Sequence, residues 1–311
     1  MDHCLSSQEY QPLFQYVVKL YDLWVTNRDL LLLNHPYEAI LEKYLTLAIY
    51  RMADFTQKKY RNLLHALMGQ GFRFQTFLEY LTNPAPKCII LRHDVDKRPQ
   101  NSLMLAQIES GLGIQGTYNF RARPCSWDEE IIREIAAMDH EIGYHYEEMA
   151  TYKGDLQKAF EAFKENLAKL RKLAPVSTVC MHGSPRSRYD SRDLWKTYNY
   201  KELEISGEPY FDVDFKQVLY LTDTGRRWDG HKVSVRDRVD DSQYQKLMEK
   251  GIRIHSTQDI IKAAEGGVLP DSIMFTIHPQ RWHKNPILWM NELIAQNLKN
   301  VAKRALLGLG R

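Results

Sequence analysis

The hydrophobic pattern of this chain changes near residue 85. Before that point, apolar residues recur at spacings of three and four, which predicts helices around 13–24, 40–48 and 56–70. The third helix is expected to stop at Gly71, because glycine adopts a left-handed conformation easily. The segment Asn83–Pro86 breaks the pattern. The sequence therefore predicts a helical region over residues 1–84, followed by a different architecture over 85–311.

After residue 85, short apolar runs alternate with amphipathic helical patterns. Strands are predicted at 88–91, 116–120, 141–145, 176–181, 217–222, 252–255 and 273–277. Helices are predicted at 100–112, from Ser126 to just before His140, at 155–173, 243–250 and 257–265, and from Pro286 onward. Ser126 with Glu129, and Ser256 with Asp259, have the spacing of capping boxes. This alternation indicates a mostly parallel sheet with helical crossovers.

Composition and charge narrow the class of protein. The chain has 311 residues, of which 44% are hydrophobic and 26% charged, as in ordinary globular proteins. A net charge of +3 is too small to indicate a nucleic-acid partner. We expect no transmembrane segment and no signal peptide, because no apolar run is long enough. Four widely spaced cysteines without a C-x-x-C pair favour reduced thiols and a cytoplasmic location over a disulfide framework.

Acidic and imidazole side chains gather where the predicted strands end. The segments concerned are Arg92–Asp96, Phe120–Arg121, Gly143–Glu148, His182–Pro185 and His278–Trp282. The carboxyl ends of parallel strands meet at one edge of a sheet, which is where α/β folds place their sites. We therefore expect these polar groups to converge on one pocket.

Asp94 and Asp96 are the first candidates for chemistry in that pocket. On an extended segment both side chains point to the same face, roughly 6–7 Å apart. Carboxylates this close repel each other unless their roles differ. A divalent ion separates the roles, since one aspartate binds the ion and the other accepts a proton from water. The alternative is that both aspartates are exposed to solvent in a turn that leads into Lys97 and Arg98.

Three histidines, His145, His182 and His278, follow predicted strands. His278 comes after the largely apolar run 273–277, and a polar ring at the end of a buried strand needs a partner. Taken singly, a histidine at such a position is more often structural. Together with Asp94 and Asp96, the three supply the nitrogen and oxygen ligands that suit zinc or a similar ion.

These segments resemble the polysaccharide deacetylase family, carbohydrate esterase family 4. Leu91–Asp96 is similar to the family's first motif, Asp139–His145 to the segment that carries a metal-ligand histidine, and Ile277–His278 to its late motif. The order of these segments, with His182–Pro185 and Thr222–Arg226 between them, is similar to a divergent branch found in surface-polysaccharide biosynthesis clusters. The resemblance covers about residues 60–300.

The resemblance implies both a fold and a reaction. The fold is an irregular, partly closed β/α barrel over 85–311, preceded by the helical region 1–84. Asp94 is the implied general base, Asp96 and His145 are implied ligands of a divalent ion, expected to be zinc, and His278 is the implied general acid. The implied reaction removes an N-acyl group, expected to be acetyl, from an amino sugar during lipopolysaccharide, capsule or other surface-glycan assembly.

The sequence departs from the family at the third metal ligand. The family has a second histidine four residues after the first, and Met149 stands at that position here. The arginine of the family's third motif is also missing. His182 is the preferred third ligand, because it ends the next predicted strand, and Glu147 is the second choice. If neither binds, the ion is expected to be weakly bound or absent. The missing second histidine also motivates the alternative of a non-catalytic glycan-binding protein. A metal hydrolase of an O-ester or a formamide is a further alternative.

Substrate contacts are expected from Arg226, Trp228, Arg281 and Trp282. Tryptophan stacks on sugar faces, and arginine binds the phosphate of a nucleotide- or lipid-linked sugar. The alternative is that both tryptophans fill the core. Residues 1–84 are expected either to cover one end of the barrel or to make a homodimer contact. The basic C-terminal segment is expected to pack on the barrel, with contact to the inner membrane surface as the less favoured alternative.

Overall fold

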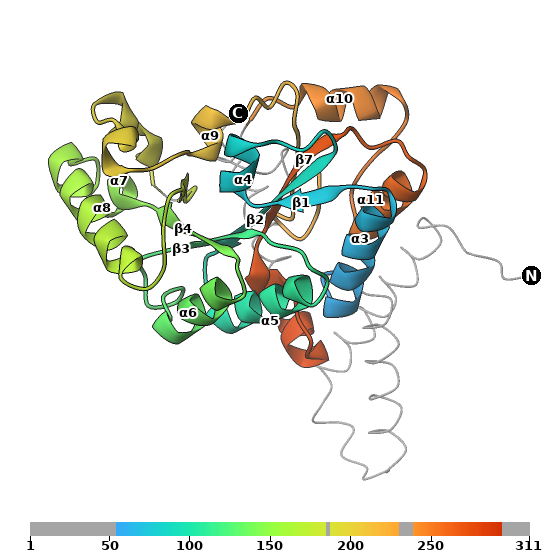
Figure 1. Ribbon diagram of the computed structural model, residues 1–311, viewed down its shortest axis with the longest axis horizontal. Helices are drawn as coiled ribbons and strands as arrows, with labels where there is room; N and C mark the ends of the chain where they lie inside the picture. The colour runs from blue at the N-terminus through green and yellow to red at the C-terminus, as the bar shows by residue number, and fades with distance from the viewer. Residues whose placement is uncertain (1–53, 185–186, 230–238, 294–311) are drawn as a thin grey trace, which may run out of the picture. The chain divides into compact units, whose positions relative to one another are not determined.

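The computed structural model describes residues 54–184, 187–229 and 239–293. In this part of the chain, helices alternate with strands, and the strands form one sheet (Figure 1). The helices predicted at 13–24 and 40–48 lie outside the described residues, as do residues 294–311. No helix in the described ranges has the length and apolar character needed to cross a membrane.

Every strand pair in the described sheet is parallel. The strands are β1 (Arg73–Gln75), β2 (Cys88–Val95), β3 (Thr117–Phe120), β4 (Glu141–Tyr146), β5 (Val179–Met181), β6 (Leu219–Thr222) and β7 (Ser272–Ile277). Their order is β5-β4-β3-β2-β7-β6, and β1 also pairs with β2. The sheet curls into a half-barrel with β5 and β6 at its edges. The predicted α/β class and parallel sheet are confirmed, and the half-barrel is compatible with a partly closed β/α barrel.

Helices pack against this sheet. They are α3 (Gln57–Gly69), α4 (Phe77–Thr82), α5 (Pro99–Ser110), α6 (Glu129–Ala137), α7 (Glu148–Thr151), α8 (Leu156–Arg171), α9 (Pro209–Asp212), α10 (Ser242–Glu249) and α11 (Thr257–Glu265). Short 3₁₀ turns are η2 (Ser191–Lys196), η3 (Tyr200–Leu203) and η5 (Pro279–Arg281). Helix α3 packs against α11, and α5 packs against α6 (Figure 1).

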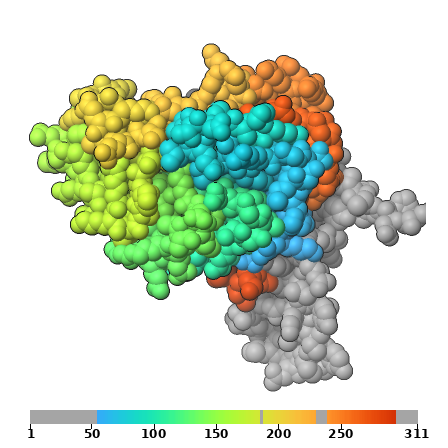
Figure 2. All heavy atoms as spheres, in the orientation of Figure 1, coloured from blue at the N-terminus to red at the C-terminus, as the bar shows by residue number. Residues whose placement is uncertain are grey.

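The arrangement of surface segments reflects the middle position of β2 in the sheet. In the space-filling view, the cyan segment that contains α4 lies between yellow-green residues on one side and orange residues on the other (Figure 2). This matches the sheet order, in which β3, β4 and β5 lie on one side of β2 and β7 and β6 on the other. Segments from both halves of the chain therefore meet around β2.

The alternation of side chains along β2 separates the core from the site. Ile89 and Leu91 belong to the apolar core that also contains Leu64 of α3 and Leu105 of α5. Val95 faces a second apolar cluster, which α6 and α8 share. Successive side chains of a strand face opposite ways, so Arg92 and Asp94 point away from the face that carries Leu91 and Val95. Arg92 and Asp94 therefore enter the interior of the half-barrel, while Leu91 and Val95 pack in the core.

One predicted helix end and one predicted helix start are confirmed, and a second predicted start is not. Gly71 has φ +78° just after α3, and Ser256 with Asp259 forms a capping box at α11, so both predictions are confirmed. The capping box predicted at Ser126 is wrong, since Asp128 is the N-cap of α6. Ser126 instead donates to the carbonyl of Val95 and accepts from the N–H of Arg121, which ties the ends of β2 and β3 together.

Two further elements differ from expectation. Residues 252–255 form no strand, and Ile254 is instead a buried core residue whose backbone contacts the Tyr244 hydroxyl. The short strand β1 was not predicted, because three residues with an exposed Arg73 carry little periodicity. Residues 54–84, expected to belong to a helical region ahead of the barrel, contribute this strand to the sheet.

Gly143 of β4 provides a test of the packing beneath the site. A Cβ at this position would overlap the side-chain oxygen of Asn119, which lies between β4 and Asp94. We predict that Gly143→Ala lowers the free energy of unfolding by about 1–3 kcal/mol, as overpacked cores do. Urea unfolding measures the change. Gly69→Ala is the matched control, since nothing lies within 4 Å of a Cβ there, and an equal loss in both variants would contradict the packing.

Candidate active site and metal centre

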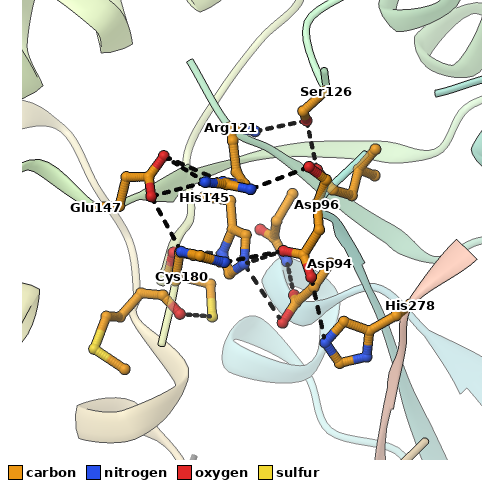
Figure 3. Close-up of polar contacts among 12 residues, drawn as sticks. Asp94, Asp96, Arg121, Ser126, His145, Glu147, Cys180 and His278 are labelled. Carbon is orange, nitrogen blue, oxygen red and sulfur yellow. Dashed lines mark hydrogen bonds and ion pairs between the residues drawn. The ribbon is translucent and has the colours of Figure 1, made fainter. Parts of the chain in front are cut away.

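Three potential ligands from three strand ends converge at the carboxyl edge of the sheet. Asp96 follows β2, His145 lies in β4, and His182 follows β5. One ligand atom from each lies within 4.8 Å of the other two, and Figure 3 shows the surrounding polar contacts. These residues could hold a metal ion, as the strand-end positions predicted.

His145 is oriented by the backbone of the neighbouring strand. It pairs in register with Cys180 of β5, and its Nδ1 lies 2.9 Å from the Cys180 carbonyl oxygen. A carbonyl only accepts hydrogen bonds, so Nδ1 carries the proton and Nε2 has a free lone pair. Nε2 lies 3.6 Å from Asp96 Oδ1, so the lone pair is available where an ion would bind.

His182 is oriented by a carboxylate. Its Nε2 lies 3.3 Å from Asp96 Oδ1, and its Nδ1 lies 3.2 Å from Glu147 Oε2. Glu147 also accepts hydrogen bonds from Arg121 and Arg123. Its carboxylate therefore lies on the far side of the imidazole, where metal-binding histidines often have a carboxylate partner. The geometry groups His182, the preferred candidate, with Asp96 and His145, and makes Glu147 its orienting partner.

The Asp96 carboxylate fits a cation. Its Oδ2 accepts a hydrogen bond from Gln280, but its buried Oδ1 has no hydrogen-bond partner among the residues that the structure describes. The contacts of Oδ1 with the two imidazoles, at 3.3 and 3.6 Å, are long for hydrogen bonds. Ligands around a tetrahedral zinc ion lie about 3.3–3.6 Å apart, given bond lengths of about 2.0–2.2 Å. A shared ion would satisfy the oxygen that the protein leaves unpaired.

Asp94 has a different environment from Asp96. Its two oxygens accept hydrogen bonds from Nε and Nη2 of Arg92, at 2.9 and 2.6 Å, and Asn119 lies 3.4 Å away. Burial would raise the pKa of Asp94, but the guanidinium of Arg92 outweighs it and holds the pKa well below its usual value. The carboxylate is therefore ionised and fixed in orientation, as a positioned base must be.

His278 lies on the opposite side of Asp96 and is held by another buried carboxylate. Its Nδ1 lies 2.6 Å from Asp223 Oδ1, and its Nε2 lies 3.9 Å from Asp96 Oδ2. Asp223, at the end of β6, is fully buried, and Arg281 lowers its pKa against the effect of burial. The imidazole is thus fixed by its Nδ1 contact with Asp223, and its Nε2 is directed toward Asp96.

Two of the four predicted substrate contacts are buried in the core. Trp228 and Trp282 are 1% and 0% exposed, so neither can stack on a sugar, and the prediction for both is corrected to a core role. Arg281 and Trp282 each donate to Asp223, at 2.5 and 2.9 Å. The guanidinium of Arg226 lies over the rings of Phe55 and Trp289. Whether Arg226 or Arg281 contacts a substrate remains a prediction.

Sequence reasoning missed two residues of the site. Arg92 could have been found, because residues 92, 94 and 96 share one face of an extended strand. Asp223 could also have been found, since it directly follows the strand predicted at 217–222. No protein-family model matches this chain, and no curated protein matches it. The resemblance to polysaccharide deacetylases therefore rests on the motifs themselves.

The first prediction for the site concerns the binding of an ion. We expect metal-stripped protein to bind one Zn²⁺, and Glu147→Gln to weaken binding by about 10–100-fold, the usual cost of losing an orienting partner. His182→Gln should weaken binding further, because it removes a ligand. A competition titration with a chromophoric chelator measures both affinities. His255→Gln, at an exposed histidine paired with Asp229, is the control. A greater loss from Glu147→Gln than from His182→Gln would make Glu147 the ligand.

The second prediction concerns the pH dependence of the metal-free protein. Burial lowers the pKa of His182, but Asp96 and Glu147 outweigh it and raise the pKa to about 9. A raised histidine pKa stabilises the folded state below the unfolded pKa of about 6.5, and that stability is lost as pH rises through about 9. We expect the free energy of unfolding to fall by up to about 3 kcal/mol across this window. Urea unfolding at several pH values measures it, and a slope unchanged in His182→Gln would refute the assignment.

Proposed function

We propose that this protein is a metal-dependent hydrolase that removes an N-acyl group, expected to be acetyl, from an amino sugar in surface-glycan assembly. The observation that carries the proposal is the arrangement around Asp96. A carboxylate held by Arg92 and an imidazole held by Asp223 flank a group of residues that could hold an ion. An acid and a base beside a cation are the groups that amide hydrolysis requires. The choice of an acylated sugar comes from the resemblance to polysaccharide deacetylases.

The ion would be held by Asp96, His145 and His182, with zinc as the expected metal. When bound, it supplies Lewis acidity that polarises a carbonyl and favours ionisation of water. Asp94 accepts the proton of the attacking water, since its carboxylate is ionised and Arg92 fixes its direction. Arg92 then remains beside the protonated carboxyl.

His278 acts on the other side of the scissile bond. Its Nε2 donates a proton to the departing amine, and Asp223 stabilises the charged imidazole before that transfer. Loss of the proton from Nε2 leaves Nδ1–H bonded to Asp223, so the ring keeps its orientation. The products are a carboxylic acid and a free amino sugar. An O-ester or a formamide would be cleaved by the same groups, and identification of the products separates these substrates.

Asp94→Asn tests the role of the base. We expect the variant to bind the ion with unchanged affinity and to lose about 10²–10⁴-fold in kcat, because an amide does not accept the proton. Hydrolysis is followed as release of free amine from N-acetylated sugars, and bound metal is quantified in the same samples.

Asp229→Asn is the matched control, because Asp229 pairs with Arg227 and His255 outside the pocket. It should retain both metal and turnover. Turnover near wild type in Asp94→Asn would remove Asp94 as the base. Wild-type protein that binds the ion but hydrolyses no acylated sugar, ester or formamide would favour the glycan-binding alternative.

A further inference from the structure

A second group of potential ligands lies directly beneath the first. It consists of Asp94, His145 and Cys180, and one ligand atom of each lies within 4.8 Å of the other two. They come from β2 and from the adjacent strands β4 and β5, with β3 between β2 and β4, and Figure 3 shows the three side chains close together. All three are at most 4% exposed, so this position is more deeply buried than that of Asp96 and His182.

The two groups differ in the chemistry of their ligands. The first offers a carboxylate and two imidazoles, and the second replaces one imidazole with a thiol. Thiolate ligands select thiophilic cations, whereas carboxylates and imidazoles bind a wider range of divalent ions. Asp94 Oδ2 lies 3.8 Å from His145 Nε2, a separation compatible with two ligands of one ion. Arg92 and Asn119 both donate to Asp94 Oδ1, whereas only Arg92 donates to Oδ2, which keeps a second lone pair for a cation.

The two groups share one ligand atom. His145 Nδ1 donates to the Cys180 carbonyl, so Nε2 is the only ring nitrogen that can bind a metal. One nitrogen lone pair binds one ion, so occupation of either position prevents His145 from serving the other. An ion in the lower position also coordinates Asp94, whose carboxylate is then no longer available to accept a proton.

We propose that Asp94, His145 and Cys180 form a second cation position that is selective for thiophilic ions and excludes the catalytic ion. Cd²⁺ is the cation that should favour it most clearly. Binding at this position does not depend on the activity of the protein. An ion bound at this position coordinates Asp94 and His145 and is therefore expected to inhibit hydrolysis. This expected inhibition rests on the proposed function.

Cadmium binding tests the position directly. Reduced, metal-stripped protein is titrated with Cd²⁺ while the ultraviolet thiolate-to-cadmium charge-transfer band is recorded. We expect wild-type protein to develop the band with saturation at one ion per chain. Cys180→Ser should lose the band and bind Cd²⁺ at least about tenfold more weakly, since losing a ligand costs no less than losing an orienting partner. His145→Gln should lose the band as well.

Cys125→Ser is the matched control, because the Cys125 sulfur also lies near the site, 3.4 Å from the Asp96 carbonyl oxygen. Cys88→Ser is a second control at a buried thiol that lies beside Ser272. Both should retain the band. A wild-type protein without the band, or a band that persists in Cys180→Ser, would overturn the proposal.

Activity measurements separate this proposal from the proposed function. If the protein hydrolyses an acylated sugar, Cd²⁺ should inhibit it, and Cys180→Ser should require about tenfold more Cd²⁺ for the same inhibition. Hydrolysis without a charge-transfer band would refute only the second position. A band that depends on Cys180 in a protein that hydrolyses nothing would refute only the hydrolase.

Discussion

This site depends on the neutralisation of two ionised carboxylates at the end of one buried strand. Asp94 is 4% exposed, and Asp96 is only partly open to solvent. A buried carboxylate without a partner costs several kcal/mol, so each must have a cationic or donor neighbour. Arg92 provides this for Asp94, and the imidazoles of His145 and His182 face Asp96. The convergence of β2, β4 and β5 is what brings these partners together.

The two aspartates differ because their partners differ. Arg92 occupies both oxygens of Asp94 with hydrogen bonds of fixed geometry, whereas Asp96 retains one oxygen that no hydrogen bond satisfies. Two like groups whose environments diverge in this way are a common basis for separate acid, base and ligand roles. The same logic applies to the histidines, since His182 has a carboxylate on its second nitrogen and His145 has a carbonyl. Neighbours two residues apart in sequence can therefore perform different chemistry.

The sequence predicted the part of the site that follows from strand direction. Asp94, Asp96, His145, His182 and His278 all end parallel strands, so their approach to one edge follows from the period of the pattern. The sequence favoured His182 over Glu147 from its strand-end position alone, but it could not predict the orientation of the His182 ring between Asp96 and Glu147. The helix start at Asp128 was missed because Ser126 bonds across two strand ends, which is a tertiary contact. Strand β1 was missed because its three residues carry too few side chains to show a period.

Trp282 shows how a buried side chain can position a site residue without contacting a substrate. The Trp282 indole is packed against Phe55 and Tyr60, and its only N–H is directed to Asp223. Arg281 donates to the same carboxylate, which in turn binds His278. A buried indole cannot change its orientation without disturbing the core around it. The segment His278–Trp282 therefore couples the core to the direction of one imidazole, and its tryptophan acts by holding Asp223 in place.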